Sequence, residues 1–340
     1  MNLQARQEGY VAELEHYFRT LLVDEYDEHA RPLWARDYSS PDAFSASVRG
    51  RRDEWRRLLG VPEFTVDGIQ SRDHADVPGG RWVTVRLDRH LTAQGLLVVP
   101  EGATRLVVFQ HGLGSTPERV MGVGDAKGTY DAVGQKLVDA GYAVLAPMNL
   151  IEIPPRNRAQ SLARLAGTTM EGLEFARFQH LLAAVAELQP EVDVDGYALT
   201  GMSWGGLAAQ FWAPLDERAA AVATLGFFNQ RSNKMVVQDT RWSSFYDHDE
   251  HHAFLQGHLV GFGDADLASL VCPRPFLVQH GRNDQIGWWP DVAEEFAKAK
   301  THWESLGVAD RISLQIHEGG HDVDAAGLVG WLGTHFPPLG

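Results

Sequence analysis

The sequence contains a single cysteine, Cys272, so no disulfide bond can form within the chain. No stretch approaches the roughly 18 consecutive apolar residues that a membrane-spanning helix needs. The first residues, MNLQARQEGYVAELEHYF, lack the basic start and the apolar stretch of a signal peptide. These absences favour a protein of the reducing cytoplasm, and we expect that location.

Basic residues are also scarce. Lysine and arginine together number 30, against 45 aspartates and glutamates, which gives a formal net charge of −15. Nucleic acids and anionic membrane surfaces are both bound mainly through basic side chains. We therefore expect neither as a partner, and we interpret the acidity as a property that favours solubility.

The usual sequence patterns of metal and nucleotide sites are missing. There is no H-E-x-x-H pattern, and Gly122 and Gly124 near Lys127 fit neither the Walker nor the Rossmann glycine spacing. The run DHDEHH at 247–252 contains possible metal ligands, but such a run is more typical of a solvated segment. We expect no metal and no cofactor.

The most informative feature that is present is the pentapeptide Gly-Met-Ser-Trp-Gly at 201–205, of the form G-x-S-x-G. An apolar, β-rich run at 194–200 precedes it, and a run compatible with a helix follows at 206–213. A sharp turn between such a strand and helix exposes the serine hydroxyl at the edge of a sheet. Glycine is required where strand and helix nearly touch. The pattern predicts Ser203 as a nucleophile.

A serine hydroxyl needs a base to remove its proton and an acid to orient that base. Asp284 follows the apolar strand pattern at 275–280, and His321 follows the one at 312–316 on a Gly-Gly turn. Functional groups in open α/β sheets gather at the carboxyl ends of the strands. We therefore predict a catalytic triad of Ser203, His321 and Asp284.

Other residues compete for the roles of base and acid. His280 and His317 are alternative bases, but both fall within or at the edge of strand patterns. Asp291 is an alternative acid and a weaker one. Asp322 and Asp324 are too close to the predicted base in sequence to orient it easily from across the site.

The turn after the strand pattern at 106–110 reads HGLG at 111–114. Backbone N–H groups in such a turn can stabilise the oxyanion of a tetrahedral intermediate. We predict that the N–H groups of Leu113 and Trp204 form this oxyanion hole. His111 itself is predicted to be structural.

With these motifs, the chain resembles an α/β-hydrolase of the dienelactone hydrolase and acetyl-xylan-esterase-like group over residues 40–336. The resemblance rests on HGLG at 111–114, GMSWGG at 201–206, CPRPFLVQHGRND at 272–284, GGH at 319–321 and the segment at 156–182. It implies a serine esterase that hydrolyses a carboxylic ester with a small acyl group or a small alcohol. Glucuronoyl esterases share part of the pattern, but they typically carry an arginine where this chain has Trp204.

The same triad also serves lactonases, thioesterases and peptidases, and a non-catalytic binding relative is a further alternative. A peptidase of the prolyl-oligopeptidase type normally has a large N-terminal domain, and about 80 residues are too few for a propeller. A binding relative usually lacks a triad member, and none is missing here. Lactonase and thioesterase activities stay open, as does the choice between an acylated sugar and an aryl or alkyl ester.

The pattern of the chain predicts an α/β-hydrolase domain at 71–340 after a helical extension at 1–70. Apolar residues at helical spacing predict an amphipathic helix over 1–26, which either packs on the domain or mediates a homo-oligomer. Ser40 and Pro41 begin a second predicted helix that ends at Gly60.

The domain itself is predicted to be a mostly parallel eight-stranded sheet flanked by helices. The strands are expected at 81–87, 92–99, 105–110, 142–147, 195–200, 219–226, 274–280 and 311–316, and helices near 127–140, 169–188, 204–214, 290–306 and 323–332. Insertions at 148–168 and 228–266 are expected to form a pocket wall or lid. Trp204, Trp288 and Trp289 are expected to bind the substrate, because aromatic faces suit sugar rings or aryl esters.

Overall fold

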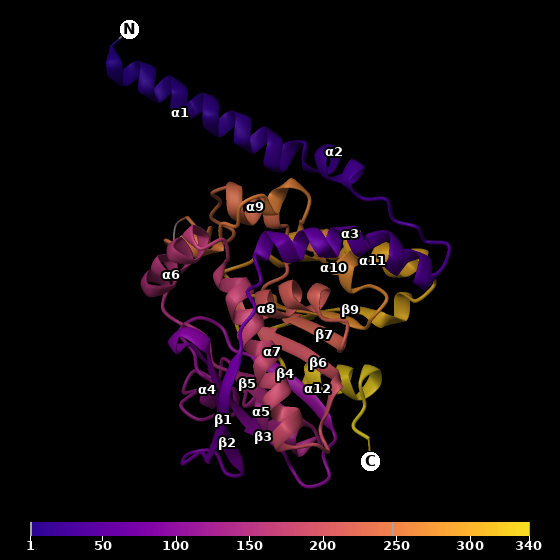
Figure 1. Ribbon diagram of the computed structural model, residues 1–340. Coiled ribbons are helices and arrows are strands. Elements are labelled where there is room, and N and C mark those ends of the chain that lie inside the picture. Colours follow the sequence, from indigo (N-terminus) through magenta and orange to yellow (C-terminus); the bar gives the residue numbers. More distant parts are fainter. Residues whose placement is uncertain (1, 247, 340) are drawn as a thin grey trace.

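The computed structural model describes residues 2–246 and 248–339, without the side chain of Arg89. Its centre is a nine-stranded sheet in the order β1-β2-β3-β5-β4-β6-β7-β8-β9 (Figure 1). The pairs β1–β2, β2–β3 and β3–β5 are antiparallel, and all the other pairs are parallel. The strands are β1 (Val66–Asp73), β2 (Gly80–Leu87), β3 (Thr92–Val98), β4 (Arg105–Gln110), β5 (Ala143–Pro147), β6 (Asp193–Met202), β7 (Ala219–Leu225), β8 (Phe276–Gly281) and β9 (Ile312–His317).

The predicted count of eight strands is wrong by one, because β1 carries no recognisable strand pattern. β1 lies at the edge of the sheet, and most of its residues are exposed or half-buried. It pairs with β2 along its whole length, from Val66 opposite Leu87 to Asp73 opposite Arg81. The backbone ladder, rather than a buried apolar face, therefore holds this strand in place.

Helices cover both faces of the sheet. One core contains residues of α3 (Pro41–Leu59), α7 (Met170–Leu188), α8 (Trp204–Trp212), α10 (Asp264–Val271) and α11 (Trp289–Ser305), and the other contains residues of α4 (Pro117–Val120), α5 (Val133–Asp139) and α12 (Ala325–His335). Side chains alternate along a strand, so each strand contributes to both cores. In β4, Leu106 and Val108 join the first core, and Val107 and Phe109 join the second.

α3 has the boundaries that the sequence predicts. The Ser40 side chain accepts a hydrogen bond from the N–H of Ala43 at 3.1 Å, and Gly60 ends the helix with a φ of 58°. Trp55 is fully buried, and its indole N–H donates to the carbonyl oxygen of Phe211 at 2.9 Å. One face of α3 is thus part of the first core.

The chain before α3 is arranged differently. α1 (Leu3–Arg19) projects away from the body, continues through a π-helical turn at Thr20–Asp24 and leads into α2 (Tyr26–Ala30) (Figure 1). No residue of α1 is buried. The hydroxyl of Tyr26 donates to Asp266 Oδ2 at 2.7 Å, so the end of this segment is tied to α10.

The two insertions contain short helices and contact each other. α6 (Ile153–Leu165) lies in the first insertion, and α9 (Arg231–Val236) lies in the second. Asn157 Oδ1 on α6 accepts a hydrogen bond from the backbone N–H of His252 at 2.8 Å. The first insertion therefore helps to hold the second.

Candidate active site

Ser203 lies on the turn between β6 and α8. Its backbone has a φ of 58° and a ψ of −119°, a strained conformation that residues other than glycine rarely adopt. A Cβ atom on Gly205 would overlap the carbonyl oxygen of Gln110, and one on Gly206 would lie 2.8 Å from that of Leu225. The glycines of the motif therefore let strand and helix come close enough to form this turn.

Asp284 and His321 meet at the ends of neighbouring parallel strands, because Asp284 follows β8 and His321 follows β9. Nδ1 of His321 lies 2.7 Å from Oδ2 of Asp284. The other carboxylate oxygen, Oδ1, accepts a hydrogen bond from the N–H of Ile286 at 2.7 Å. With Nδ1 held by the carboxylate, Nε2 of the imidazole is the nitrogen that can accept a proton.

The surroundings of Asp284 keep it ionised. Only 1% of its side chain is exposed, and burial alone would raise its pKa. The hydrogen bond and the charge of His321, together with the nearby His280, instead bring the pKa of Asp284 below its ordinary value. His280 Nε2 lies 3.9 Å from Asp284 Oδ2. A buried carboxylate of this kind can stabilise a protonated imidazole.

Ser203 and His321 line the same cavity of about 450 Å³. Gly112 and Leu113 also line it, and a Cβ atom on Gly112 would lie 3.0 Å from Cβ of Ser203. Trp204 is the first residue of α8, so its N–H has no acceptor within the helix. Both predicted oxyanion donors therefore lie next to the predicted nucleophile.

The cavity has further polar lining residues that the sequence motifs do not indicate. The hydroxyl oxygen of Tyr130, which is 2% exposed, accepts a hydrogen bond from the N–H of Gly112 at 2.9 Å. Arg119 pairs with Asp125 at 2.9 Å, and Lys127 is exposed. Arg119 lies on α4, and Lys127 and Tyr130 lie in the loop between α4 and α5. The only sign of this loop in the sequence is the glycine-rich stretch around Lys127.

No protein-family model and no curated protein matches the sequence, but solved structures do. A protein from Bacteroides fragilis assigned as an acetyl xylan esterase aligns with a TM-score of 0.64 and 14% identity, over 83% of this chain and 77% of its own. A glucuronoyl esterase of carbohydrate esterase family 15 from Caldicellulosiruptor kristjansonii aligns with a TM-score of 0.61 and 18% identity, over 84% of this chain and 85% of its own. A methylesterase aligns with a TM-score of 0.65 and 15% identity, over 93% of this chain and 69% of its own. The chain has the α/β-hydrolase fold.

In this α/β-hydrolase fold, the residue after Ser203 turns its side chain into the interior. Trp204 is 5% exposed, and the Arg156 guanidinium lies 4.8 Å and the His252 ring 4.5 Å from its indole. Arg156 is fully buried and pairs with Glu174 at 2.6 Å and with Glu171 at 3.4 Å. This network holds the indole of Trp204 in the interior.

None of the three tryptophans predicted to bind substrate is among the residues that line the Ser203 cavity. Trp288 and Trp289 lie at the start of α11, where Arg241 lies 4.3 Å from the first ring and Arg282 lies 4.9 Å from the second. No described residue of the two insertions lines the cavity either. A substrate-binding role for these tryptophans stays a prediction.

The rival bases His280 and His317 do not line the cavity that contains Ser203 and His321. His280 is buried, its Nε2 lies 3.3 Å from the carbonyl oxygen of Gly287, and burial lowers its pKa. His317 Nδ1 accepts a hydrogen bond from the N–H of Gly319 at 3.1 Å. Burial raises the pKa of Asp291 on α11. The geometry therefore favours Asp284 and His321 over these rivals.

Within residues 2–246 and 248–339, no group of three or more histidines, cysteines, aspartates or glutamates is placed to hold a metal ion. Asp247, the first residue of the DHDEHH run, lies outside the described residues. In the same described part of the chain, no helix has both the length and the apolar character needed to cross a bilayer.

Proposed function

We propose that the protein is a carboxylic ester hydrolase that works through Ser203, His321 and Asp284. The observation that carries the proposal is the 2.7 Å contact between His321 Nδ1 and Asp284 Oδ2, beside a cavity that also contains Ser203 on its strained turn. The order of the three residues along the chain is the one used in the α/β-hydrolase fold. The esterase names of the structural neighbours support the same reaction class.

Acylation begins when Oγ of Ser203 attacks the carbonyl carbon of the ester and Nε2 of His321 takes the hydroxyl proton. Asp284 holds the imidazole and stabilises its cationic form. The N–H groups of Leu113 and Trp204 stabilise the oxyanion, a contribution of about 2.7–4 kcal/mol for each donor. The bond from the carbonyl carbon to the alcohol oxygen then breaks, and His321 gives its proton to the leaving alcohol.

Deacylation repeats these steps with water as the nucleophile. His321 takes a proton from a water molecule, which attacks the acyl carbon of the Ser203 ester. The second tetrahedral intermediate uses the same N–H donors. Its collapse breaks the bond to Ser203 Oγ, which receives the proton from His321, and releases the carboxylic acid.

The size of the cavity supports a small acyl group. Its volume of about 450 Å³ falls at the lower end of the roughly 300–1,000 Å³ found for ligand pockets. The neighbours are named for acetyl xylan, glucuronoyl and methyl esters. Arg156, the cation nearest Trp204, is fully buried and already paired with two glutamates, so it is not free to bind a uronate carboxylate. We therefore place acetyl esters first among the substrates.

Hydrolysis of p-nitrophenyl acetate, butyrate, octanoate and palmitate tests this proposal, with the Ser203→Ala variant beside the wild type. We expect turnover that favours acetate, and a loss of about a million-fold in kcat in the variant. Acetate release from acetylated xylan oligomers and methanol release from methyl uronates then separate the two carbohydrate substrates. Turnover that survives the substitution would show that the reaction takes place elsewhere.

Lactonase, thioesterase and peptidase activities use the same residues, and comparison substrates separate them. Acyl thioesters, small lactones and peptide nitroanilides should be turned over more slowly than p-nitrophenyl acetate. A non-catalytic relative of the fold would leave Ser203 unreactive toward a fluorophosphonate probe. Covalent labelling of the wild type, absent in Ser203→Ala, would exclude that alternative.

The cytoplasm is the location that we propose for this reaction. The chain has one cysteine, and burial raises the pKa of Cys272 to about 12, so its thiol stays protonated. A protein without disulfides suits a reducing compartment. Detection of the protein in the soluble fraction after release of extracytoplasmic contents would support this location, and its recovery among the released proteins would contradict it.

A further inference from the structure

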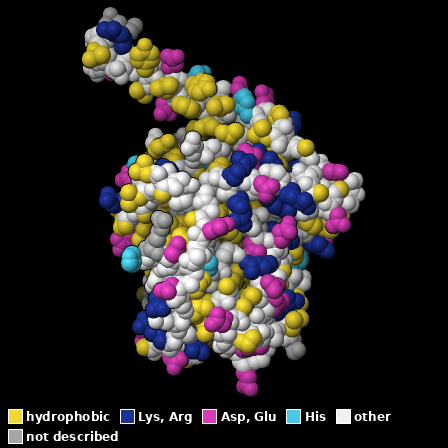
Figure 2. Space-filling view, in the orientation of Figure 1, with side chains coloured by type: hydrophobic (Ala, Val, Ile, Leu, Met, Phe, Trp, Pro, Cys, Tyr) yellow, Lys and Arg dark blue, Asp and Glu magenta, His cyan; other side chains and the backbone are white. Residues whose placement is uncertain are grey.

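α1 carries an apolar stripe that nothing in the described chain covers. Its six large apolar side chains each keep 49–70% of their surface exposed: Leu3, Tyr10, Val11, Leu14, Tyr17 and Phe18. Figure 2 shows this stripe along the projecting helix, where hydrophobic side chains outnumber charged ones. Most of the stability of a helix in a protein comes from packing of its apolar face, and α1 buries none of its residues. A partner that covers the stripe is therefore expected.

The body of the same chain cannot be that partner. The helix continues from α1 without a break, because Thr20 at its end keeps helical angles and the π-helical turn runs to Asp24. That turn is anchored: residues 20–23 are half-buried and lie against α9. The stripe is thus held away from the body and cannot fold back onto it.

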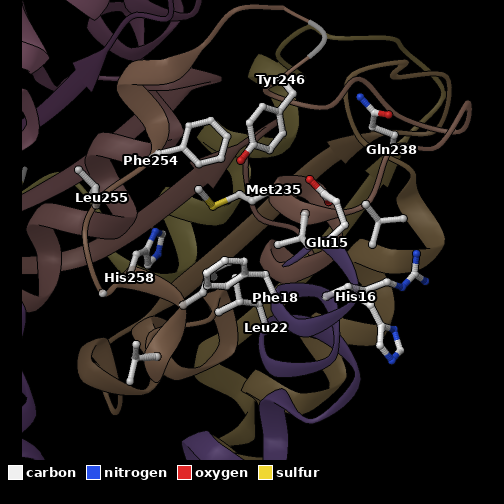
Figure 3. Close-up of a pocket in the computed structure, with 16 residues that line it drawn as sticks. Glu15, His16, Phe18, Leu22, Met235, Gln238, Tyr246, Phe254, Leu255 and His258 are labelled. Carbon is white, nitrogen blue, oxygen red and sulfur yellow. The ribbon is translucent and has the colours of Figure 1, made fainter. Parts of the chain in front are cut away.

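An apolar groove lies at the base of the projecting helix. It has a volume of about 880 Å³, and Figure 3 shows Phe18 and Leu22 on one side and Met235, Tyr246 and Phe254 on the other. Two groups at its rim, Tyr246 and Val260, are 55% and 58% exposed. The groove and the stripe therefore form one continuous apolar surface, which combines a protruding helix with a recess.

We propose that this surface binds a second copy of the chain, with the two α1 helices packed antiparallel about a twofold axis between Tyr10 and Leu14. In such an isologous pair, the protruding helix of each copy can pack against the recess of the other copy. α1 is about 25 Å long at 1.5 Å per residue. Full overlap brings Leu3 of the partner subunit over Phe18 and Leu22, at the mouth of the groove.

The area of the surface fits a dimer. The six exposed side chains of the stripe provide roughly 600 Å² of apolar surface per chain, taking 150–250 Å² for a whole aromatic side chain. Specific interfaces bury about 800 Å² per partner. The rim of the groove supplies the remainder.

The charge of α1 argues against a membrane as the occupant. Helices that lie on anionic membranes are rich in lysine and arginine on the polar face. α1 contains no lysine; it has two arginines, Arg6 and Arg19, against three glutamates, Glu8, Glu13 and Glu15, in a chain of net charge −15. A second copy, which buries the stripe without needing positive charge, is the better match.

Sedimentation velocity of the full-length protein over a dilution series tests the proposal. We expect a dimer of 75.2 kDa, twice the chain mass of 37.6 kDa. Leu14→Glu should raise the dimer dissociation constant by about 100-fold, because an interface residue counts twice in a twofold pair. The matched control is Ala12→Glu, which makes the same charge change about 200° farther around the helix, on the face opposite the stripe. It should sediment like the wild type.

Cross-linking with a short bismaleimide gives an independent measurement, because the native Cys272 is buried. Leu14→Cys should yield a covalent dimer, and Ala12→Cys should not. Wild-type protein that remains at 37.6 kDa at every concentration, or dimers that Leu14→Glu leaves intact, would overturn the proposal. Co-sedimentation with phosphatidylcholine or phosphatidylserine vesicles, lost in Leu14→Glu, would assign the stripe to a membrane instead. Ester hydrolysis by the monomeric variant separates this result from the proposed activity.

Discussion

Asp284 fixes the orientation of the base in the proposed mechanism, because its Oδ2 lies 2.7 Å from Nδ1 of His321. In the Asp284→Asn variant, the amide can donate to Nδ1 and so select the tautomer that carries its proton on Nε2. That tautomer cannot accept the proton of Ser203. We expect kcat for p-nitrophenyl acetate to fall by about 10³–10⁴-fold with little change in KM.

The matched control for this variant is Asp291→Asn. Asp291 is also a buried aspartate, 8% exposed, but it lies on α11, where the nearest cation is Arg241 and not His321. Its substitution should leave kcat within a few-fold of the wild type. An equal loss in both variants, or full activity in Asp284→Asn, would remove Asp284 from the role of orienting acid.

Tyr130 positions the oxyanion turn through its hydroxyl, which accepts the hydrogen bond of Gly112 N–H at 2.9 Å. Tyr130→Phe leaves this buried N–H without its acceptor, a cost of about 1–3 kcal/mol in the free energy of unfolding. The turn that carries Leu113 N–H then relaxes. Since one oxyanion donor is worth about 10²–10³ in kcat, we expect a displaced donor to cost 10–100-fold, with KM nearly unchanged.

Tyr142→Phe is the control for Tyr130→Phe. The Tyr142 hydroxyl is also buried and donates to the carbonyl oxygen of Phe336 at 2.9 Å, on the second core and outside the cavity. It should lower the melting temperature without lowering kcat. Similar kcat values for the two variants would show that Tyr130 matters for stability alone.

The three proposed catalytic residues could be predicted because their chemistry leaves local marks in the sequence. Ser203 needs glycines beside its strained turn, and Asp284 and His321 each follow an apolar strand. Tyr130 and Arg156 leave no such mark, since their partners are 18 positions away in each case, at Gly112 and at Glu174. Those contacts arise from the way the chain folds back, which no short motif records.

At the scale of elements, Lys234 links the second insertion to the loop that carries Asp284. Its ammonium group donates to the carbonyl oxygens of Ser243 and Ile286, and Ile286 in turn donates its N–H to Asp284. Lys234 is 4% exposed, and burial, together with the charge of Arg231, lowers its pKa to about 8. The insertion therefore contains a buried amine that loses its proton at about pH 8.

This low pKa predicts a pH dependence of stability. The lysine of the unfolded chain keeps its proton up to its ordinary pKa of 10.5. Between pH 8 and 10.5 the unfolded chain thus binds more protons than the folded one, so this group makes stability rise with pH. From pH 7 to 9.5 the free energy of unfolding of the wild type should rise by about 2 kcal/mol relative to Lys234→Met.

Urea denaturation of both proteins at the two pH values measures this difference. Lys234→Arg is the control: it keeps a charge throughout this range and should lack the rise, as Lys234→Met does. Parallel curves for the wild type and Lys234→Met would mean that the pKa of Lys234 is not lowered in the folded protein.

The elements that could be predicted are those buried on both sides. β4 and β5 appear in the sequence as continuous apolar runs, since every residue of β5 and nearly every residue of β4 is buried. β1 could not be predicted, because an exposed edge strand is held by backbone pairing that has no side-chain pattern. The insertions could be located by their length. The cavity could not, because its lining comes from other segments in the part of the chain that the structure describes.

At the scale of the whole molecule, α1 and α3 show how similar patterns lead to different environments. Both are helices with apolar residues at helical spacing, 17 and 19 residues long. α3 buries Phe44, Val48, Trp55 and Leu59 in the first core, whereas α1 buries none of its residues. The periodicity predicts that each helix has an apolar face, but it cannot identify the surface that covers it.

Two truncations test this difference between the helices. A chain without residues 2–19 loses α1, which contributes nothing to the core, so it should fold, hydrolyse p-nitrophenyl acetate at the wild-type rate and sediment as a monomer. A chain without residues 2–60 also loses α3. Burial of Trp55 alone is worth about 3–5 kcal/mol, against a total stability of about 5–15 kcal/mol for a typical protein.

The loss of the four buried side chains of α3 therefore exceeds what the fold can tolerate, and the longer truncation should be unfolded or insoluble. Circular dichroism melting curves and the esterase assay distinguish the two outcomes. A longer truncation that melts cooperatively and stays active would show that the sheet and its remaining helices form an independent unit. In that case α3, like α1, would be a helix whose partner is not the core of its own chain.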